Sequence, residues 1–181
     1  MTLVAGHTTL SIPVLEADGL RLRAPKASDF PAYWEYCASE RSRTVGGPYD
    51  QVQSMDRFLG LTGHWAYHGF GRWIIADGAT NAPMGVSGLY YPPDWPEPEI
   101  AWTVFGPAEG QGVAYRAAQI VRRYAYEVLG WTTVMSAVDP NNTRSVALAK
   151  RMGAHPDGSF DLSGHGPLTI WRHPAPAEVL A

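Results

Sequence analysis

Six residues in the second half of the chain read Glu109-Gly110-Gln111-Gly112-Val113-Ala114. They stand between an apolar segment, 99–105, and a long periodic segment, 113–129, which predicts a turn from a strand into a helix. Small residues let such a turn bend tightly and leave backbone N–H groups pointing outward. The first helical turn adds a partial positive charge, so this stretch predicts a binding site for a pyrophosphate.

Two well-known phosphate-binding turns do not match this stretch. A P-loop needs Gly-Lys-Ser/Thr at the start of the helix, where this chain has Val113-Ala114-Tyr115. A dinucleotide-binding fingerprint needs a third glycine at Tyr115 and a strand–helix–strand unit early in the chain. Two readings remain from the residues alone, a site for another pyrophosphate ligand and a purely structural turn.

Outward from this turn, hydrophobic periodicity predicts strands and helices along most of the chain. The expected strands cover 20–23, 72–76, 84–90, 99–105, 131–138, 159–162 and 167–171. The expected helices cover 29–37, 51–67, 113–129 and 143–152, the second with an inner face of Val52, Met55, Phe58, Leu59 and Trp65. The first dozen residues and Pro174 to Ala181 are expected to be loosely ordered.

The order of these elements favours an α/β (α+β) fold. Successive strands in the first half predict antiparallel pairing, and the strand–helix–strand order near the end predicts a parallel crossover. A mixed sheet with helices on both faces follows.

A second motif, Asn142-Thr143-Arg144-Ser145, begins the last long helix. Asn142 and Ser145 are three residues apart, so on a first helical turn they share a face. They can hydrogen-bond one ligand. Alternatively, Asn142 caps the helix and Ser145 is a surface residue.

Composition excludes several classes of protein. A length of 181 residues suits one domain, 1–181, with a core of about 20–173, and a net charge of −3 argues against a nucleic-acid binder. The single cysteine, Cys37, excludes an internal disulfide and a zinc-thiolate site, and it indicates a reducing, cytoplasmic location. Its apolar helix favours buried packing, and the scattered histidines predict no metal site. Residues 1–19 lack the features of a signal peptide, and no segment reaches the length of a membrane span.

With both motifs in place, the chain resembles the GNAT acetyltransferase superfamily, in the branch similar to ribosomal-protein N-terminal (alanine/serine) acetyltransferases. The resemblance extends over about 20–173. It rests on the order and spacing of four segments: Leu20 to Pro25 with Asp29, Pro83 to Leu89, Gly110 to Ala114, and Asn142 to Ser145 followed by Met152-Gly153. It implies a mostly antiparallel, splayed sheet with acetyl-CoA bound in the opening.

The resemblance also implies a set of coenzyme-binding residues. The strand of Trp102, Thr103, Val104 and Phe105 would pair with the pantetheine arm, and a backbone N–H near Val104 or Phe105 would stabilise an oxyanion. Asn142 would contact pantetheine and Ser145 the sulfur, while Arg144, Lys150 and Arg151 would either contact the outer phosphate or form a solvated face. The pyrophosphate would be held by the turn residues Gly110, Gln111, Gly112, Val113 and Ala114.

Two positions depart from the family pattern. Glu109 stands where Gln or Arg is common, and its carboxylate is expected to repel a pyrophosphate unless it points away. Ala149 stands where many relatives have a tyrosine that protonates the leaving thiolate. Ser145 is the substitute that the resemblance suggests, as a hydrogen-bond donor to the thiolate.

Acetyl transfer to an amine also needs a base, because an alkyl amine has a pKa near 10. Glu99, at the start of the coenzyme strand, is the candidate, with Glu97 in reserve. The alternative is a solvated carboxylate at a strand edge.

The acceptor is expected to be a peptide N-terminus or a small-molecule amine, bound by a monomer or homodimer. Its pocket is expected between the loops 39–50, 91–98 and 157–167, with an aromatic wall of Tyr90, Tyr91 and Trp95. The departures at Glu109 and Ala149 keep a second function open, a catalytically weak or inactive acyl-CoA sensor.

Overall fold

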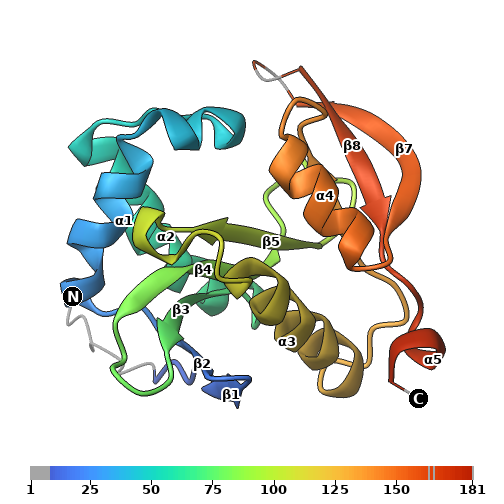
Figure 1. Ribbon diagram of the computed structural model, residues 1–181, viewed down its shortest axis with the longest axis horizontal. Coiled ribbons are helices and arrows are strands. Elements are labelled where there is room, and N and C mark those ends of the chain that lie inside the picture. Colours follow the sequence, from blue (N-terminus) through green and yellow to red (C-terminus); the bar gives the residue numbers. More distant parts are fainter. Residues whose placement is uncertain (1–8, 163, 165, 181) are drawn as a thin grey trace, which may run out of the picture.

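The computed structural model describes residues 9–162, 164 and 166–180 (Figure 1). Its strands are β1 (Leu15–Ala17), β2 (Leu20–Arg23), β3 (Arg72–Asp77), β4 (Pro83–Tyr90), β5 (Glu99–Val104), β6 (Met135–Val138), β7 (His155–Leu162) and β8 (Gly166–Arg172). Its helices are α1 (Phe30–Cys37), α2 (Gln51–His68), α3 (Val113–Glu127), α4 (Thr143–Arg151) and α5 (Pro176–Val179). Three short 3-10 segments are η1 (Ala27–Asp29), η2 (Glu40–Val45) and η3 (Gly106–Ala108).

The described strands form one eight-stranded sheet in the order β1-β2-β3-β4-β5-β6-β8-β7. Every neighbouring pair is antiparallel except β5 and β6, which are parallel and share a single register pair, Glu99 with Met135. The mixed, mostly antiparallel sheet predicted from the sequence is therefore confirmed. Its one weak junction lies between β5 and β6.

Helices cover both faces of the first half of the sheet (Figure 1). Trp73 and Ile75 of β3 pack with Ala117 and Val121 of α3, in the larger core cluster. Ile74, between them in sequence, packs instead with Phe58 of α2 and the residues of α1. This alternation explains why β3 is apolar between its charged ends, from Trp73 to Ala76, because both of its faces are covered there.

Several predicted boundaries and faces differ from the structure. On α2, Phe58 and Trp65 are buried, but Val52 and Leu59 are 71% and 61% exposed and Met55 is also exposed. Leu61 takes the buried place, so the predicted inner face was shifted around the helix. The strand predicted from 131 begins only at Met135, and α3 ends at Glu127.

The ends of the chain are more ordered than expected where the structure describes them. Strand β1 was not predicted, and the Trp73 indole donates a hydrogen bond to the Pro13 carbonyl at 2.8 Å. Near the C-terminus, α5 forms and Leu180 packs against the larger core. The expectation for the first eight residues and for Ala181 lies outside the described residues.

Candidate active site

The junction between β5 and β6 is bridged by side chains in place of a backbone ladder. The Glu99 Oε2 accepts the Ala137 N–H at 2.7 Å, and the Ser136 hydroxyl donates to the Ile100 carbonyl at 2.7 Å. Beyond Glu99, these strands share no further register pair. The sheet therefore opens along β5, and backbone groups of this strand are left without a neighbouring strand on that side.

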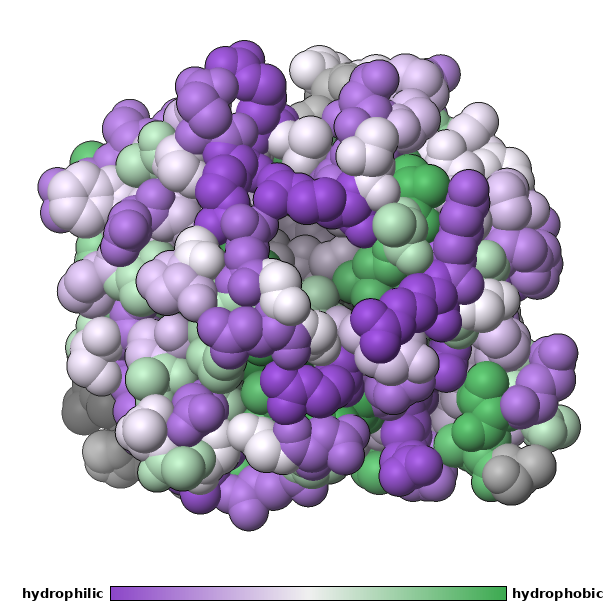
Figure 2. Space-filling view, viewed as in Figure 1, coloured by the Kyte–Doolittle hydropathy of each residue, from purple (hydrophilic) through white to green (hydrophobic). Residues whose placement is uncertain are grey.

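A cavity of about 350 Å³ lies at this opening, between β5, the N-terminal end of α3 and the first turns of α4. Figure 2 shows the molecule hollowed in the middle of this face, with hydrophilic residues above the hollow and hydrophobic residues along its right side. The predicted coenzyme residues that line the cavity are Val104, Gly110, Gly112, Val113, Ala114, Asn142 and Ser145. The structure therefore brings together residues from three separate segments of the chain.

The glycine turn leaves the start of α3 uncapped. Gly110 and Gly112 have φ values of 73° and 71°, in the left-handed region that favours glycine. Gly112 is the N-cap and supplies no side chain to the helix, whose first backbone bond runs from the Arg116 N–H to the Gly112 carbonyl. The N–H groups of Val113 and Ala114, which face no earlier turn, are thus available to an anion in the cavity.

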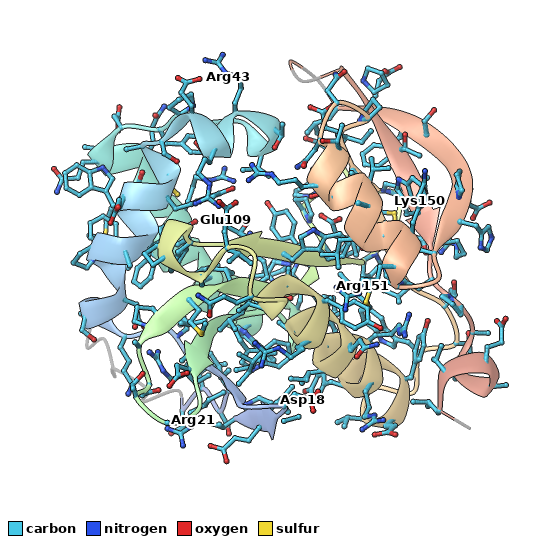
Figure 3. The ribbon with its side chains drawn as sticks, in the orientation of Figure 1. Asp18, Arg21, Arg43, Glu109, Lys150 and Arg151 are labelled. Carbon is cyan, nitrogen blue, oxygen red and sulfur yellow. The ribbon has the colours of Figure 1, made fainter. Side chains whose placement is uncertain are left out.

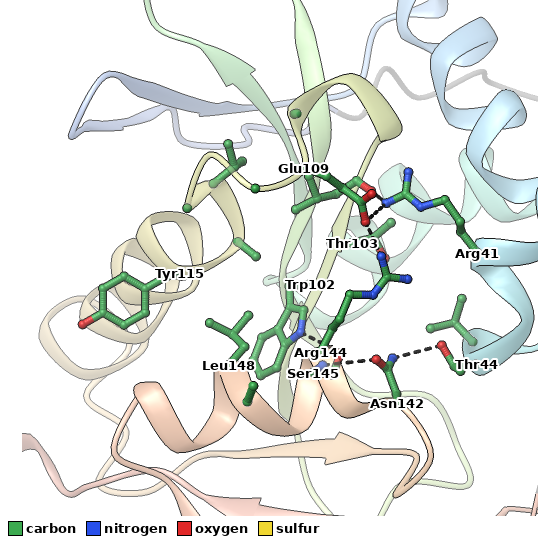
Figure 4. Close-up of a pocket in the computed structure, with 18 of the residues that line it drawn as sticks. Arg41, Thr44, Trp102, Thr103, Glu109, Tyr115, Asn142, Arg144, Ser145 and Leu148 are labelled. Atoms are coloured by element: carbon green, nitrogen blue, oxygen red, sulfur yellow. Dashed lines mark hydrogen bonds and ion pairs between the residues drawn. The ribbon is translucent and has the colours of Figure 1, made fainter.

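The carboxylate of Glu109, beside this turn, is paired with two cations. Its carboxylate forms ion pairs with Arg41 of η2 and with Arg144 of α4, and Figure 4 shows both guanidinium groups converging on it. All three side chains line the cavity. The repulsion expected of Glu109 is therefore offset in this structure by two cations that the carboxylate holds at the same site.

The backbone of β5 offers Val104, and not Phe105, to the opening. The Phe105 N–H donates to the Met84 carbonyl of β4 at 2.8 Å, and its ring is buried among Tyr33 and Tyr36. Because alternate residues of an antiparallel strand point their N–H groups to opposite sides, Val104 faces away from β4. The Val104 carbonyl accepts Arg41 Nη2 at 3.0 Å on that side. Phe105, predicted to bind the coenzyme, lies outside the cavity.

The side chains of Gln111 and Lys150, two residues considered for coenzyme contact, point away from the cavity. Gln111 does not line the cavity, and its amide donates to the Pro107 carbonyl at 2.9 Å. Lys150 lies toward β8, with Nζ 6.0 Å from the ring centroid of Trp171, whereas Arg151 stacks on Tyr115 of α3 at 4.1 Å (Figure 3). Of these residues, Arg151 alone lines the cavity.

Asn142 and Ser145 begin α4 at the inner end of the cavity. The Asn142 Oδ1 accepts the Ser145 N–H at 3.1 Å, so Asn142 caps the helix, which was one of the two predicted roles. The Asn142 amide also donates to the Thr44 hydroxyl at 2.9 Å. The Ser145 hydroxyl accepts the Trp102 indole N–H at 3.2 Å. Its own proton is therefore available to a ligand.

A second cavity, of about 340 Å³, lies on the other side of this point. It extends between α1, η2, β4, β5 and β6, and Tyr90 and Trp95 form part of its wall, as predicted. The third predicted aromatic, Tyr91, does not line it, and the Tyr91 N–H donates to His64 at 3.0 Å. The two cavities meet at a shared set of residues: Tyr36, Thr44, Val45, Trp102, Thr103, Asn142 and Ser145.

Glu99 lines the second cavity and is only 5% exposed. Its Oε1 accepts the Trp95 indole N–H at 2.9 Å. Burial raises the pKa of Glu99 to about 7, against the lowering effect of the Ala137 and Trp95 hydrogen bonds and of Arg72. The reading of Glu99 as a solvated edge carboxylate is therefore wrong. Glu97, the reserve candidate, lies outside both cavities and pairs with Arg172 at 2.5 Å.

Several residues of the two cavities were missed by sequence reasoning. Arg41 was expected only as part of a loop, and Tyr36, Arg57 and Arg72 were not singled out. Each reaches the site from an element distant in sequence, and no local motif marks it. Ala149, at the family's tyrosine position, is fully buried with Val138 and Trp171, so it leaves no hydroxyl there.

Other expectations concern the rest of the described chain. Cys37 is buried, as predicted. Among the described residues, no three His, Cys, Asp or Glu side chains are grouped as a metal site would require. Within the same residues, no helix combines the length and the apolar character needed to cross a membrane.

Comparison with known proteins gives the family. Residues 19–155 match the model of the acetyltransferase (GNAT) domain. An acetyltransferase from Agrobacterium tumefaciens superposes with a TM-score of 0.83 at 35% identity, over 94% of this chain and 99% of that one. A GNAT-family acetyltransferase from Bordetella pertussis gives 0.74 at 22% identity, over 90% and 100% of the two chains. A ribosomal-protein-S5-alanine acetyltransferase from Vibrio fischeri shares the fold, with a TM-score of 0.65 at 16% identity over 89% and 96%. The chain belongs to the GNAT acetyltransferase family.

Proposed function

We propose that the protein is an acetyl-CoA-dependent N-acetyltransferase whose acceptor is a primary amine, attacking directly in a ternary complex. One observation carries the proposal. The buried carboxyl of Glu99 lines the second cavity, which meets the first at Trp102, Asn142 and Ser145. We call the first the coenzyme-type cavity and the second the acceptor cavity, after the ligands proposed for them. An amine in one cavity and a thioester in the other would therefore meet beside a base.

The residues of the first cavity suit the coenzyme. The uncapped start of α3 and the guanidinium groups of Arg41 and Arg144 are donors that match phosphate oxygens. The backbone of Val104 is the strand edge that suits the amides of a pantetheine arm. Acetyl-CoA, when bound, supplies the activated acetyl group as a thioester.

The chain's own residues supply the proton steps. Glu99 takes a proton, directly or through water, from the ammonium or from the attacking amine, a role that a carboxyl with a pKa of about 7 suits at neutral pH. The Val104 N–H stabilises negative charge on the acetyl oxygen as the nitrogen bonds to the acetyl carbon. The carbon–sulfur bond breaks, and the Ser145 hydroxyl hydrogen-bonds the departing thiolate until water protonates it.

The acceptor is a peptide N-terminus or a small-molecule amine. The fold shared with a ribosomal-protein acetyltransferase supports a peptide acceptor. The second cavity, of about 340 Å³, can hold a small amine or the first residues of a peptide. We place the reaction in the cytoplasm, in agreement with the lone thiol of Cys37, and assign it to a monomer or homodimer.

Release of free coenzyme thiol tests the proposal. The purified protein is incubated with acetyl-CoA and a panel of amines and N-terminal peptides, with an acceptor-free control for hydrolysis. Thiol release that depends on one class of amine, with the acetylated product identified by mass, supports the enzyme.

Coenzyme binding without turnover on any acceptor favours the second function, an acyl-CoA sensor. The observation behind that alternative is the buried Ala149, which leaves the usual tyrosine hydroxyl absent from α4.

A further inference from the structure

Two arginines from different elements line the acceptor cavity. They are Arg57 of α2 and Arg72 at the start of β3. Among the described residues, no carboxylate lies within 4.0 Å of either guanidinium, and the Arg72 Nε is buried without a hydrogen-bond partner. Both side chains are half-buried. A cation that is partly removed from water and has no anionic partner is costly, so such a pair is unusual unless a ligand completes it.

Aromatic rings hold both arginines in place. The Arg72 Cζ lies 4.1 Å from the ring centroid of Tyr90, and the Arg57 Cζ lies 4.3 Å from that of Tyr49. Stacking of this kind orients a guanidinium without using its N–H donors. The donors of both side chains therefore stay free while the side chains themselves are fixed.

Both arginines line the same cavity as the buried Tyr33. Burial raises the pKa of Tyr33 to about 12, and the positive charges of Arg72 and Arg57 both oppose that rise. This agrees with the lining of the cavity, to which Tyr33, Arg57 and Arg72 all contribute. Gly88 permits this position for Arg72, since a Cβ there would come within 2.4 Å of the Arg72 Cα.

The acidic side chains of the cavity do not neutralise this pair. Asp94 is exposed, and Asp139 accepts the Asn141 N–H at 2.8 Å. Glu99 accepts hydrogen bonds from Trp95 and Ala137, and Arg72 affects it only through a charge that opposes the rise of its pKa, without an ion pair between them. The acceptor cavity thus has a basic site in addition to its candidate base.

We propose that the acceptor amine also carries a carboxylate, and that Arg57 and Arg72 bind this carboxylate while the amine lies near Glu99. The inference rests on the proposed function and narrows its substrate class. A guanidinium fork matches a carboxylate in two parallel hydrogen bonds, which a neutral amide of the same shape cannot accept as strongly. The carboxylate belongs either to a free amino acid or to an acidic residue near a peptide N-terminus.

Matched acceptor pairs test this selectivity. Free amino acids are compared with their amides, and peptides with Glu at the second or third position are compared with the Gln peptides. We expect kcat/KM to favour each carboxylate over its amide by roughly 10- to 100-fold, the range of charged hydrogen bonds. The pair with the larger ratio identifies the source of the carboxylate.

The variants Arg57→Gln and Arg72→Gln should each remove most of this ratio by raising KM for the carboxylate. Arg72→Gln also removes a charge that opposes the rise of the Glu99 pKa, so the acid-to-amide ratio is compared within each variant at one pH. Arg123→Gln is the matched control, because Arg123 lies on the exposed side of α3 in a pair with Glu127. Equal kcat/KM for acids and amides in the wild type overturns the inference but leaves the proposed function intact.

A binding measurement separates the two failures. N-acetyl amino acids and N-acetyl amides, the expected products, are titrated into the wild type and the two variants. Should no amine be acetylated, the proposed function fails, and tighter binding of the acids that is lost in both variants still supports the carboxylate site. Equal binding of acids and amides overturns it.

Discussion

The two cavities that meet at Trp102 and Ser145 differ in whether their arginines are paired with a carboxylate. In the coenzyme-type cavity, Arg41 and Arg144 share the carboxylate of Glu109. In the acceptor cavity, Arg57 and Arg72 have no carboxylate within 4.0 Å among the described residues and stack on tyrosines instead. An anionic ligand that enters the first cavity must replace Glu109 as the partner of its arginines. An anionic ligand that enters the second cavity binds arginines that have no carboxylate partner.

The two cavities also differ in the part of the chain that forms them. The first depends on the backbone of a short contiguous turn and of β5, whose N–H groups are presented by chain geometry. The second depends on side chains of α1, α2, β3 and β4 brought together by the sheet. Removal of single side chains should therefore affect the acceptor cavity most, whereas the coenzyme-type cavity should be most sensitive to changes that fill or distort its turn.

The largest effect is expected for Glu99→Gln. An amide cannot take the proton of the amine, so kcat/KM at neutral pH should fall by roughly 10²- to 10⁴-fold, the usual contribution of a general base. The pKa of Glu99 is raised to about 7, so the basic form is gained as pH rises through 7. The wild-type rate should therefore fall as pH drops below about 7, and the variant should lack this limb.

A pH profile of kcat/KM from 5.5 to 10 checks this expectation. The matched control is Glu97→Gln, because Glu97 lies outside both cavities in a pair with Arg172. It should retain the limb near pH 7. Loss of the limb in the control, but not in Glu99→Gln, would move the base from the acceptor cavity to Glu97.

The sequence identified most of the turn residues that line the first cavity, and their binding of a coenzyme stays a prediction. The turn 109–114 carries its signal in contiguous residues, and small residues with helical periodicity after them mark one local geometry. The structure accordingly places Gly110, Gly112, Val113 and Ala114 together. The error at Phe105 has a simple cause, because the direction of one N–H depends on the pairing of β5 with β4.

The acceptor cavity was predicted less completely for a physical reason. Arg57 and Arg72 stand on α2 and β3 without any local motif around them, and only the folded chain brings them to one cavity with Tyr33 and Glu99. The inner face of α2 was displaced for a related reason, since Val52 and Leu59 are apolar but solvent-exposed. Hydrophobicity alone did not identify Ser54 as a buried residue of this helix.

Gly112→Leu should break the coenzyme-type cavity next. A side chain here extends into open space at the start of α3, where a Cβ meets nothing within 4 Å, and it would occupy the volume expected for the pyrophosphate. We expect acetyl-CoA affinity to fall by roughly 100-fold or more, since several charge-assisted hydrogen bonds are lost together. Calorimetric titration with acetyl-CoA and coenzyme A measures this.

Gly130→Leu controls for backbone strain. Gly130 follows α3 with φ of 70°, nearly the φ of Gly112, and a Cβ there also meets nothing within 4 Å. Both variants therefore pay a similar cost for a left-handed non-glycine residue, about 1–2 kcal/mol. If the two lose coenzyme affinity equally, the turn is not the phosphate site.

Ser145→Ala examines the point where the cavities meet. Removing the hydroxyl takes away a hydrogen bond to the departing thiolate, so kcat should fall by up to about tenfold with little change in coenzyme affinity. Single-turnover and steady-state kinetics separate the two quantities. Thr143→Ala, in the same first turn of α4 but exposed and outside both cavities, should leave both unchanged. A fall in affinity without a fall in kcat would assign Ser145 to coenzyme binding alone.

Glu109→Gln should have the smallest effect, and it should raise acetyl-CoA affinity where the other variants lower activity or affinity. It tests whether the pairing of Arg41 and Arg144 with a carboxylate opposes coenzyme binding. Without the carboxylate, Arg41 and Arg144 need no partner exchange and the repulsion of phosphate is removed. The ion pairs of Glu109 are partly exposed, so acetyl-CoA affinity should rise by only about two- to fivefold, and less at high salt. Glu127→Gln is the matched control, because Glu127 also pairs with an arginine on the surface but away from both cavities. Weaker coenzyme binding in Glu109→Gln would mean that the main effect of the carboxylate is to position Arg41 and Arg144. Both cavities would then bind an anion through arginines that neighbouring side chains hold in place.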